Sequence, residues 1–396
     1  MVTSSVVFSG LRLAPMTQAG ADPIQVLDDA EIHVEDGAVV FVGPGREAPD
    51  RAGDATVCDM GGRLALPGFV ACHNAVLWVG QNDETAGKDG ASYRTLTHAV
   101  CKQTSETADD ALLETARARL ARLRRSGVTA YELKSGFGAS PGEDLRLARL
   151  CRRLQSESAA LARVTLQTGQ ALCDDADPDA SLEDIVTKLV PDVRALNACD
   201  AVEVFCDDEG GLDLDQASTI LEAFYKQKTP SRVGCDRFCD SAAATLPASF
   251  YSRAATYLCK SDDTALRSIA DTGTTMILTP DIAGLRGEFR PDVDAIRAAG
   301  GRIAVSCEAG PAGSGELDIL RTARAGVSRL GLSESEALLA ITTYAAMALG
   351  VKKEIGTIEV GKRCDLALFD AEGVSDLFRG GECVATVTAG RLAWRQ

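Results

Sequence analysis

Histidine is scarce in this sequence, which contains only three among its 396 residues. A site built from a cluster of imidazole groups is therefore not expected. Basic side chains are also in the minority, since 41 lysines and arginines face 57 acidic residues and leave a formal net charge of −16. This excess of negative charge repels nucleic acids and acidic membrane surfaces, so neither is expected as a partner.

Long apolar runs are missing as well. No stretch approaches the roughly 18 apolar residues of a membrane helix, and the N-terminus has no basic segment followed by an apolar core. The 13 cysteines are an odd number, and none forms a Cys-x-x-Cys pair. Most lie in apolar segments, which is typical of buried, reduced thiols. We therefore expect a cytoplasmic protein without a membrane span.

The two ends of the chain share a pattern of short strands separated by turns. Strand-like segments occur at 5–8, 30–34 and 38–42, and again at 365–369 and 383–388. Between them lie eight further strand-like segments, at 66–72, 128–133, 163–168, 201–205, 232–236, 254–258, 274–278 and 302–307. Helix-like segments separate these, at 107–126, 143–157, 182–196, 214–226, 291–299 and 316–330.

This alternation predicts an α/β fold, namely a (β/α)8 TIM barrel, with a doubly wound parallel sheet as the second option. The strand-rich ends predict a small β-sandwich domain built from both chain termini. We expect that composite domain to comprise residues 1–66 plus 355–396. The barrel is expected to comprise residues 67–354.

Several segments resemble the amidohydrolase superfamily and, within it, the imidazolonepropionase family. The segment LPGFVACHNA at 66–75 resembles the first barrel strand of the superfamily. Further similar segments are GASY at 90–93, ELKSGFG at 132–138, VFCD at 204–207 and GTIEVGKRCDL at 356–366. The resemblance follows the chain order over nearly its whole length. It implies a TIM barrel and a hydrolase of cyclic amide C–N bonds that uses one divalent metal ion, Zn or Fe.

In this family the metal is held by two histidines on strand 1, one on strand 5 and an aspartate on strand 8. His73 retains the first of these positions, but the second is Ala75. The strand 5 position is Gly234, and Glu308 replaces the aspartate with a longer side chain. A catalytic metal usually needs at least three protein ligands, so the resemblance predicts a degenerate metal site without a bound ion.

Other positions of the family pocket are changed too. Asp236 is kept, but Arg237 occupies the position of the proton-transferring residue, and a guanidinium cannot act as a base near neutral pH. Gln170 and Tyr257 stand where the family has pocket histidines, and Asp83 aligns with an arginine that binds substrate.

These changes predict a catalytically inactive imidazolonepropionase-like protein, a pseudoenzyme with a structural or binding role. The residual pocket positions are His73, Asp236 and Glu308, with no confident catalytic residue among them. Asp236 and Glu308 form either a carboxylate pair for acid–base chemistry or salt bridges with Arg237 or Lys134. The alternative function is an active hydrolase whose site is rebuilt or independent of metal.

The remaining pocket could still hold a small ligand. Tyr93 and Lys134 match positions that grip an acidic ligand in the family, and Gln170, Arg237 and Tyr257 are further candidates for substrate binding. Thiolates are a weaker option for a rebuilt metal site: Cys206 and Cys239 could reach the barrel mouth through loops, whereas Cys72, Cys235 and Cys307 should face the surrounding helices.

The resemblance also suggests self-association, because members of this family tend to form homodimers. A protein partner within a larger complex is the other expected association. His33 and His98 lie outside the pocket positions and are expected to be structural.

Overall fold

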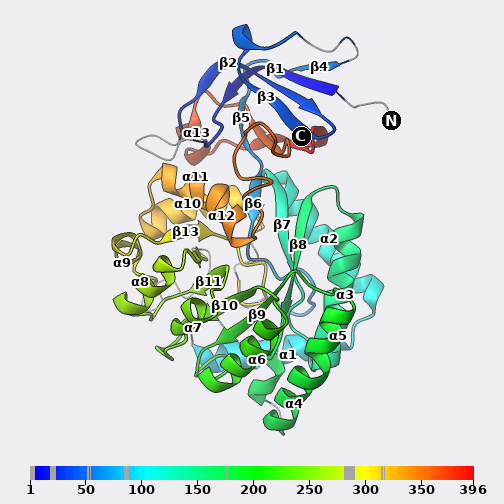
Figure 1. Cartoon of the computed structure of the whole chain (residues 1–396), viewed down its shortest axis with the longest axis vertical. Helices are drawn as coiled ribbons and strands as arrows, with labels where there is room; N and C mark the ends of the chain where they lie inside the picture. Colours follow the sequence, from blue (N-terminus) through cyan, green and yellow to red (C-terminus); the bar gives the residue numbers. More distant parts are fainter. Residues whose placement is uncertain are drawn as a thin grey trace.

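The computed structural model describes residues 5–17, 24–50, 53, 55–81, 83, 89–174, 176–280, 290–313, 315 and 317–396. Its strands form two sheets of eight strands each, one contributed by the chain ends and one by the middle of the chain. Figure 1 shows the first at one end of the molecule and the second, surrounded by helices, below it. Among the described residues, no helix is long and apolar enough to cross a bilayer.

The sheet from the chain ends, called here the terminal sheet, has the order β16-β15-β14-β5-β1-β2-β3, with β4 paired to β1. Its strands are β1 (Ser5–Leu13), β2 (Leu27–Glu35), β3 (Ala38–Pro44), β4 (Thr56–Asp59), β5 (Leu64–Pro67), β14 (Leu366–Phe369), β15 (Cys383–Thr388) and β16 (Arg391–Arg395). It folds over a core of its own that includes Phe8, Ile32 and Leu366. His33 in β2 is buried here and hydrogen bonds Glu31, as the structural role expected for it requires.

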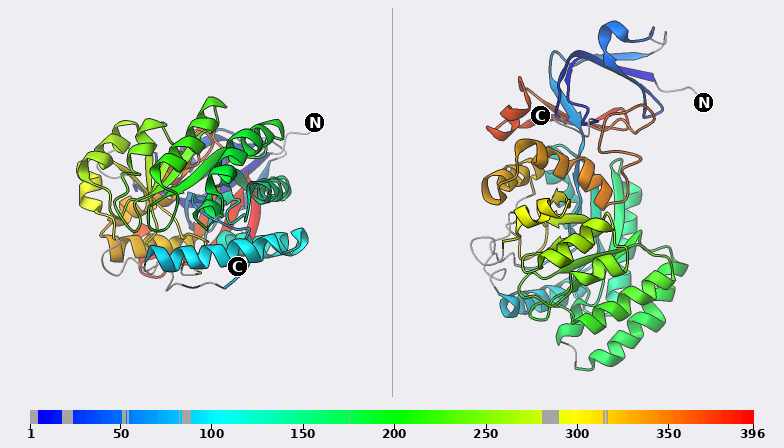
Figure 2. Two further views of the ribbon diagram at one scale, coloured as in Figure 1. Left: turned by 90° about the horizontal axis from the view of Figure 1, so that it is seen from below. Right: turned by 60° about the vertical axis from the view of Figure 1, so that its left-hand side comes forward.

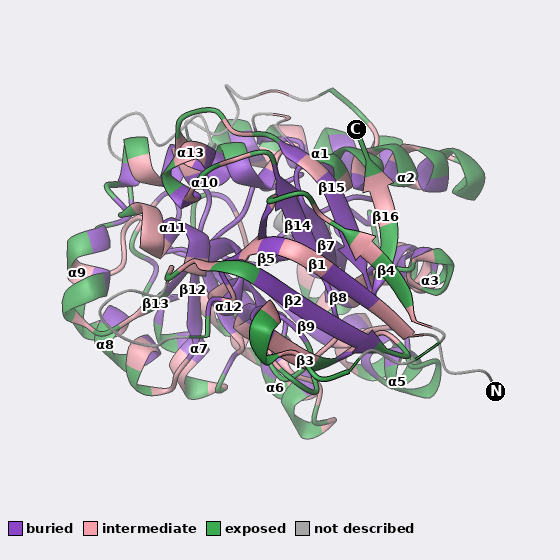
Figure 3. Cartoon of the chain, turned by 90° about the horizontal axis from the view of Figure 1, so that it is seen from above, coloured by how far each residue is buried: buried purple, intermediate pink, exposed green. Residues whose placement is uncertain are grey.

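The second sheet is parallel and follows the chain order from β6 to β13. Its strands are β6 (Phe69–Ala71), β7 (Val128–Lys134), β8 (Leu161–Gln167), β9 (Ala201–Cys206), β10 (Ser231–Cys235), β11 (Ala254–Tyr257), β12 (Thr275–Leu278) and β13 (Arg302–Val305). It curls into the predicted TIM barrel, so this expectation is confirmed. Figure 3 shows its strands buried and the surrounding helices exposed on their outer faces.

The helices of the barrel and its loops are α1 (Gly90–Ser105), α2 (Asp109–Arg125), α3 (Pro141–Glu157), α4 (Pro178–Asp184), α5 (Val190–Ala195), α6 (Leu214–Lys226), α7 (Thr245–Ser249), α8 (Asp263–Asp271), α9 (Val293–Ala298), α10 (Ile319–Leu330), α11 (Glu334–Ile341) and α12 (Thr343–Ala348). Short 3-10 helices occupy Gly45–Glu47 and Gln170–Asp174, and α13 (Val374–Phe378) lies between β14 and β15. The helix expected at 182–196 is interrupted by a π-helical turn at Ile185–Leu189.

Helix α2 shows how the sequence pattern produces these elements. Leu113, Ala116, Leu120 and Leu123 are buried on one face, as their spacing predicts. Acidic residues occupy its first turn and arginines its last, so both ends complement the helix dipole. Gly127 then ends the segment with a φ of 96°, which favours glycine.

Alternate residues of each barrel strand point inward and outward. In β7, Tyr131 and Leu133 pack in the core shared with the helices, whereas Ala130 lies in a separate inner cluster. Residues Glu132 and Lys134 have the same parity as Ala130 and therefore point into the barrel. The charged side chains of this strand are thus held inside by its register.

The two ends of the barrel are closed by different helices. Ala345 and Ala348 of α12 pack on the inner cluster around Ala130, on the side of the terminal sheet in Figure 1. Helix α1 lies at the opposite end of the barrel (Figures 1 and 2). Its Tyr93 packs against Phe205 at the carboxyl end of β9.

The first and last barrel strands meet through one side chain. The Ser306 hydroxyl accepts a hydrogen bond from the His73 N–H and donates one to the His73 carbonyl, both at 3.1 Å. Both residues are buried. The two hydrogen bonds therefore join the segments that follow β13 and β6.

Replacing Ser306 with alanine is expected to lower the free energy of unfolding by about 1–3 kcal/mol, because the buried His73 main chain loses both partners. Urea unfolding followed by circular dichroism measures this change. Ser249→Ala, an exposed serine on α7, is the matched control and should change stability by less than about 0.5 kcal/mol. Equal stability of the two variants would show that the hydroxyl does not hold the barrel closed.

Candidate functional site

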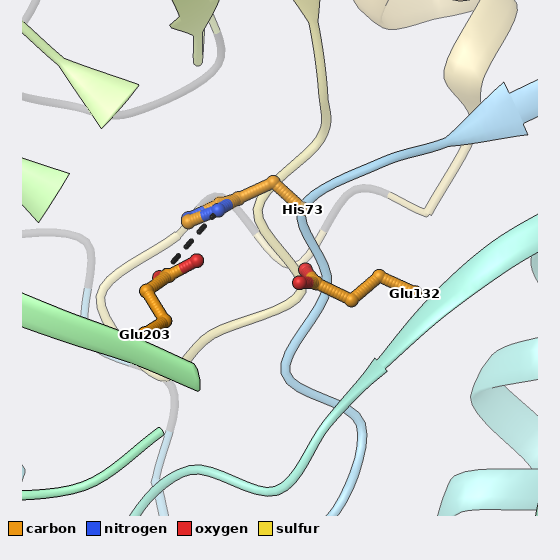
Figure 4. Close-up of side chains that lie close together, drawn as sticks. All are labelled: His73, Glu132 and Glu203. Atoms are coloured by element: carbon orange, nitrogen blue, oxygen red, sulfur yellow. Dashed lines mark ion pairs between the residues drawn. The ribbon is translucent and has the colours of Figure 1, made fainter. Parts of the chain in front are cut away.

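Five side chains that carry charge or titrate meet inside the barrel. Glu132 and Lys134 come from β7, Glu203 from β9 and Arg232 from β10, while His73 follows β6. Each of these side chains is at most 4% exposed. Figure 4 shows the imidazole and the two carboxylates pointing toward one another. We call these five residues the inner ionic cluster.

Lys134 lies at the centre of this cluster. Its ammonium is 2.9 Å from His73 Nδ1 and donates a short hydrogen bond to Glu203 Oε1. Its distance to Glu132 Oε2 is 3.8 Å. His73 Nδ1 and Glu203 Oε1 are themselves 3.9 Å apart, so the ammonium bridges them.

Arg232 completes the cluster from the side of the inner barrel core. Its Nε is 3.1 Å from Glu203 Oε2 and 3.3 Å from Glu132 Oε1. Its terminal nitrogens donate to the carbonyls of Cys72 and Ala348, at 2.7 and 3.2 Å. The guanidinium is therefore fixed by both carboxylates and by two main-chain oxygens.

The cluster is close to electrically neutral. Burial, reinforced by the positive charge of Lys134, lowers the pKa of His73 well below 6.5, so its imidazole is uncharged near neutral pH. Burial alone would raise the pKa of Glu203, but the charges of Lys134 and Arg232, with the hydrogen bond from Lys134, outweigh it and lower this pKa to about 2. Two carboxylates thus balance two cations, as a buried ionic group requires.

The distances between the ligand atoms of His73, Glu132 and Glu203 would also allow these residues to hold a metal ion. Their ligand atoms all lie within 4.8 Å of one another. Carboxylate and imidazole are suitable ligands for Zn²⁺ or Fe²⁺. However, the Lys134 ammonium lies within hydrogen-bonding distance of two of these ligands.

A second cluster lies toward α1 and is built around Arg237. The guanidinium carbon is 4.7 Å from the ring centre of Tyr93 and 4.9 Å from those of Phe238 and Tyr257. Phe205 packs edge-on against Tyr93 and Tyr257, with ring centres 5.5 Å apart in both pairs. We call these five residues the aromatic pocket. Cation–π contact stabilises the buried charge of its arginine.

The aromatic rings fill the space next to Gly234. A Cβ atom at this position would lie 3.1 Å from Phe205 and 3.2 Å from Tyr257. The imidazole expected there in a metal-binding relative would need these rings to move. Tyr257 also packs edge-on against His73, with ring centres 5.8 Å apart, so the aromatic pocket borders the inner ionic cluster.

The two residual carboxylates, Asp236 and Glu308, have different partners. Glu308 is 3.7 Å from Arg237 and accepts a hydrogen bond from the Tyr257 hydroxyl at 3.0 Å. Asp236 instead accepts hydrogen bonds from the main-chain N–H groups of Ser241, Ala243 and Ala244 and from the Ser261 hydroxyl. These contacts give Asp236 a structural role in the loop after β10.

The other candidate positions are spread around the barrel mouth. Ala75 packs against Trp78 and Phe137. Gln170 lines a cavity of about 240 Å³ beside α1, together with Phe205. The main-chain N–H of Asp83 donates to the Pro311 carbonyl at 3.0 Å, and His98 is exposed on α1.

Three cysteines beside former ligand positions, Cys72, Cys235 and Cys307, are expected to face the surrounding helices. This expectation is correct for two of them. Cys235 and Cys307 lie in the core shared with the helices. Cys72 lies in the inner barrel cluster with Val70, so its predicted orientation is wrong. Val70 and Cys72 share the inward parity of this strand, so alternation still holds at Cys72. His73, which follows the end of β6 at Ala71, also points inward, and it is this departure from alternation that makes the prediction for Cys72 wrong.

Sequence reasoning did not identify Glu132, Glu203 and Arg232 as site residues. Each interrupts a strand of apolar residues at a position that alternation directs inward. Charged residues are rarely fully buried unless they are paired. Three of them at inward positions of the strands β7, β9 and β10 are therefore a signal of a buried ionic cluster.

Comparison with known proteins agrees with this architecture. The sequence model of the amidohydrolase family matches residues 253–393. The imidazolonepropionase of Sphingopyxis alaskensis is 31% identical over 381 residues, 93% of both chains. That of a Methylobacterium strain is 32% identical over 378 residues, 92% of this chain and 93% of its own.

Solved structures show the same fold at low sequence identity. A zinc-bound adenosine deaminase from Xanthomonas campestris is 16% identical with a TM-score of 0.75, covering 99% of this chain and 93% of that protein. A variant of an Arthrobacter aurescens atrazine chlorohydrolase, complexed with zinc, is 16% identical with a TM-score of 0.77, covering 98% of this chain and 95% of that one. With the curated relatives above 30% identity, this shows that the chain belongs to the imidazolonepropionase-like proteins of the amidohydrolase family.

Proposed function

We propose that this protein is a catalytically inactive member of its family, with a binding or structural role in place of metal-dependent hydrolysis. The observation that carries the proposal is the loss of ligand atoms at Ala75 and Gly234 together with the contacts of Lys134. Its ammonium hydrogen bonds both His73 and Glu203, two of the three side chains that could otherwise hold an ion. A cation is therefore already present among these ligands.

A divalent ion at this position would have to displace the ammonium. Lys134 would then lose its partners while remaining 3% exposed, and an unpaired buried charge costs several kcal/mol. The ion would also add two positive charges to a group that is already balanced. The residues present thus do not fit a resident metal ion in this arrangement.

The aromatic pocket supports the same conclusion. Phe205 and Tyr257 occupy the space beside Gly234. Arg237 occupies the position at which the family has its proton-transferring residue. Arg237 itself cannot activate water as a base near neutral pH, since a guanidinium stays protonated. The proposal includes a protein partner or self-association, as a homodimer or within a larger complex.

The second candidate function is an active hydrolase of cyclic amide C–N bonds. It is favoured by the distances within the His73, Glu132 and Glu203 group and by its relatives, which are named imidazolonepropionases. In that case Lys134 would have to withdraw when an ion binds. Metal content and activity distinguish the two functions.

Protein purified without chelators is expected to contain far less than one equivalent of Zn or Fe and to leave imidazolone propionate unhydrolysed. Elemental analysis by mass spectrometry and a chromatographic substrate assay measure these quantities. Because thiols also bind zinc, His73→Ala is the matched control. A stoichiometric ion that is lost in His73→Ala, together with substrate turnover, would contradict the proposal.

Replacing Lys134 with methionine is expected to lower the free energy of unfolding by about 3–5 kcal/mol, because Glu203 stays buried without its closest cation. The double variant Lys134→Met/Glu203→Gln removes one charge of each sign and should recover at least half of this loss. Urea unfolding of the three proteins gives both values. If Lys134→Met is as stable as the unsubstituted protein, Lys134 is not the cation that neutralises the cluster.

The lowered pKa of His73 predicts a dependence of stability on pH. The folded protein keeps this imidazole neutral, whereas the unfolded chain protonates it below about pH 6.5. The unfolded state then binds more protons, so acidification from pH 7 to 5 should cost about 2 kcal/mol through His73. Glu203 contributes only at lower pH, since its stabilisation is lost between its unfolded pKa of 4.5 and its folded pKa of about 2.

Urea unfolding at pH 7 and pH 5 measures this effect. His73→Gln should lose about 2 kcal/mol less than the unsubstituted protein over this interval. His98→Gln, at an exposed position of α1, should behave like the unsubstituted protein. An identical pH dependence in all three proteins would show that His73 is not held neutral by the cluster.

A further inference from the structure

The aromatic pocket contains a buried cation with unused hydrogen-bonding capacity. The Arg237 side chain is 3% exposed, and neither Nη1 nor Nη2 has a hydrogen-bond partner among the described residues. The rings of Tyr93, Phe238 and Tyr257 stabilise its charge but leave both terminal nitrogens without an acceptor. Buried donors without partners cost about 1–3 kcal/mol, and more when charged.

A buried acceptor atom that also lacks a hydrogen-bond partner lies next to the Arg237 guanidinium. Glu308 Oε1 accepts from the Tyr257 hydroxyl and lies 3.7 Å from Arg237 Nη1. Glu308 Oε2 is buried and has no hydrogen-bond partner among the described residues. The pocket therefore holds unpaired donors and an unpaired acceptor side by side.

The backbone at this place is also unusual. Tyr257 and Glu308 have positive φ angles of 77° and 32°, in the region that favours glycine. Such conformations in residues with side chains are found preferentially at ligand sites. Both residues carry the side chains that surround the Arg237 guanidinium.

A cavity of about 240 Å³ shares one wall residue, Phe205, with the aromatic pocket. It is lined by Phe205 and Gln170 and, from α1, by Arg94, His98 and Lys102. Phe205 also contacts Phe238 and Tyr257, with ring centres 6.4 and 5.5 Å apart, so it belongs to both the cavity wall and the pocket. Cavities for drug-sized ligands measure about 300–1,000 Å³, so this space fits a smaller molecule.

We infer that the aromatic pocket binds a small zwitterion of the α-amino acid class. Its carboxylate accepts hydrogen bonds from the two terminal nitrogens of Arg237, a geometry for which the guanidinium is suited. Its ammonium donates to Glu308 Oε2, and its side chain contacts the aromatic rings. A simple anion satisfies only the arginine, because it would stand beside the Glu308 carboxylate.

This inference rests on the binding role proposed above and gives it a ligand class. It uses residues that differ from those of the inner ionic cluster. If the inference fails, the expected low metal content and lack of hydrolysis are unaffected, because both are measured without the ligand. Conversely, metal-dependent turnover would overturn the proposed function whatever the pocket binds.

The test uses three matched probes and isothermal titration calorimetry on the full chain. L-leucine carries both charged groups, isocaproate lacks the ammonium and isoamylamine lacks the carboxylate. L-leucine should bind saturably, and each analogue at least about tenfold more weakly. Absence of L-leucine binding at about 10 mM, or equal binding of L-leucine and isocaproate, would overturn the inference.

Two substitutions assign the contacts. Arg237→Met should weaken L-leucine binding at least about tenfold, whereas Arg117→Met, on the exposed face of α2, should leave it unchanged. Glu308→Gln should bring isocaproate binding to the level of L-leucine, because the amide no longer repels a carboxylate or favours an ammonium. If Arg237→Met does not fold, Arg237→Lys, which keeps the charge but not the paired donors, should show the same loss. Full binding in the arginine variants would overturn the inference.

Discussion

The hydrogen bonds of Lys134 to His73 and Glu203 are the interaction on which the barrel interior depends. Three strands and the segment after β6 place charged or titrating groups inside the barrel, where each side chain is at most 4% exposed. Such a group is stable only when its charges balance, and the lysine supplies the cation that brings the two glutamates into balance with Arg232. The imidazole stays neutral because burial and the nearby ammonium lower its pKa.

The family relationship favours a hydrolase, whereas the side chains inside the barrel favour a binding or structural role. Relatives named imidazolonepropionase share about a third of its residues over nearly the whole length. The barrel fold follows that relationship. Inside the barrel, however, an ammonium lies among the ligand atoms, and Phe205 and Tyr257 lie beside Gly234. A scaffold can persist while the chemistry of its site changes, since packing and catalysis depend on different residues.

The aromatic pocket extends the same principle. In the inner ionic cluster the carboxylates are engaged by neighbouring cations, whereas Arg237 and Glu308 retain unpaired atoms. In the first cluster Glu132 Oε1 lacks a hydrogen bond, but Arg232 Nε lies 3.3 Å from it. In the second, both terminal nitrogens of Arg237 and Glu308 Oε2 lack hydrogen bonds. This difference separates a structural group from a candidate binding site, although the two share the contact between His73 and Tyr257.

The sequence by itself determined the barrel, because strand and helix periodicities and the end signals of helices such as α2 are local. It also located the changed positions Ala75, Gly234 and Arg237, since a single residue type shows whether a ligand atom is present. Only the tertiary structure decided what replaced them. Glu203 and Arg232 are far from Lys134 along the chain, and their pairing depends on strand register and distances that no local pattern contains. The different partners of Asp236 and Glu308 likewise depend on loop geometry, which local sequence does not specify.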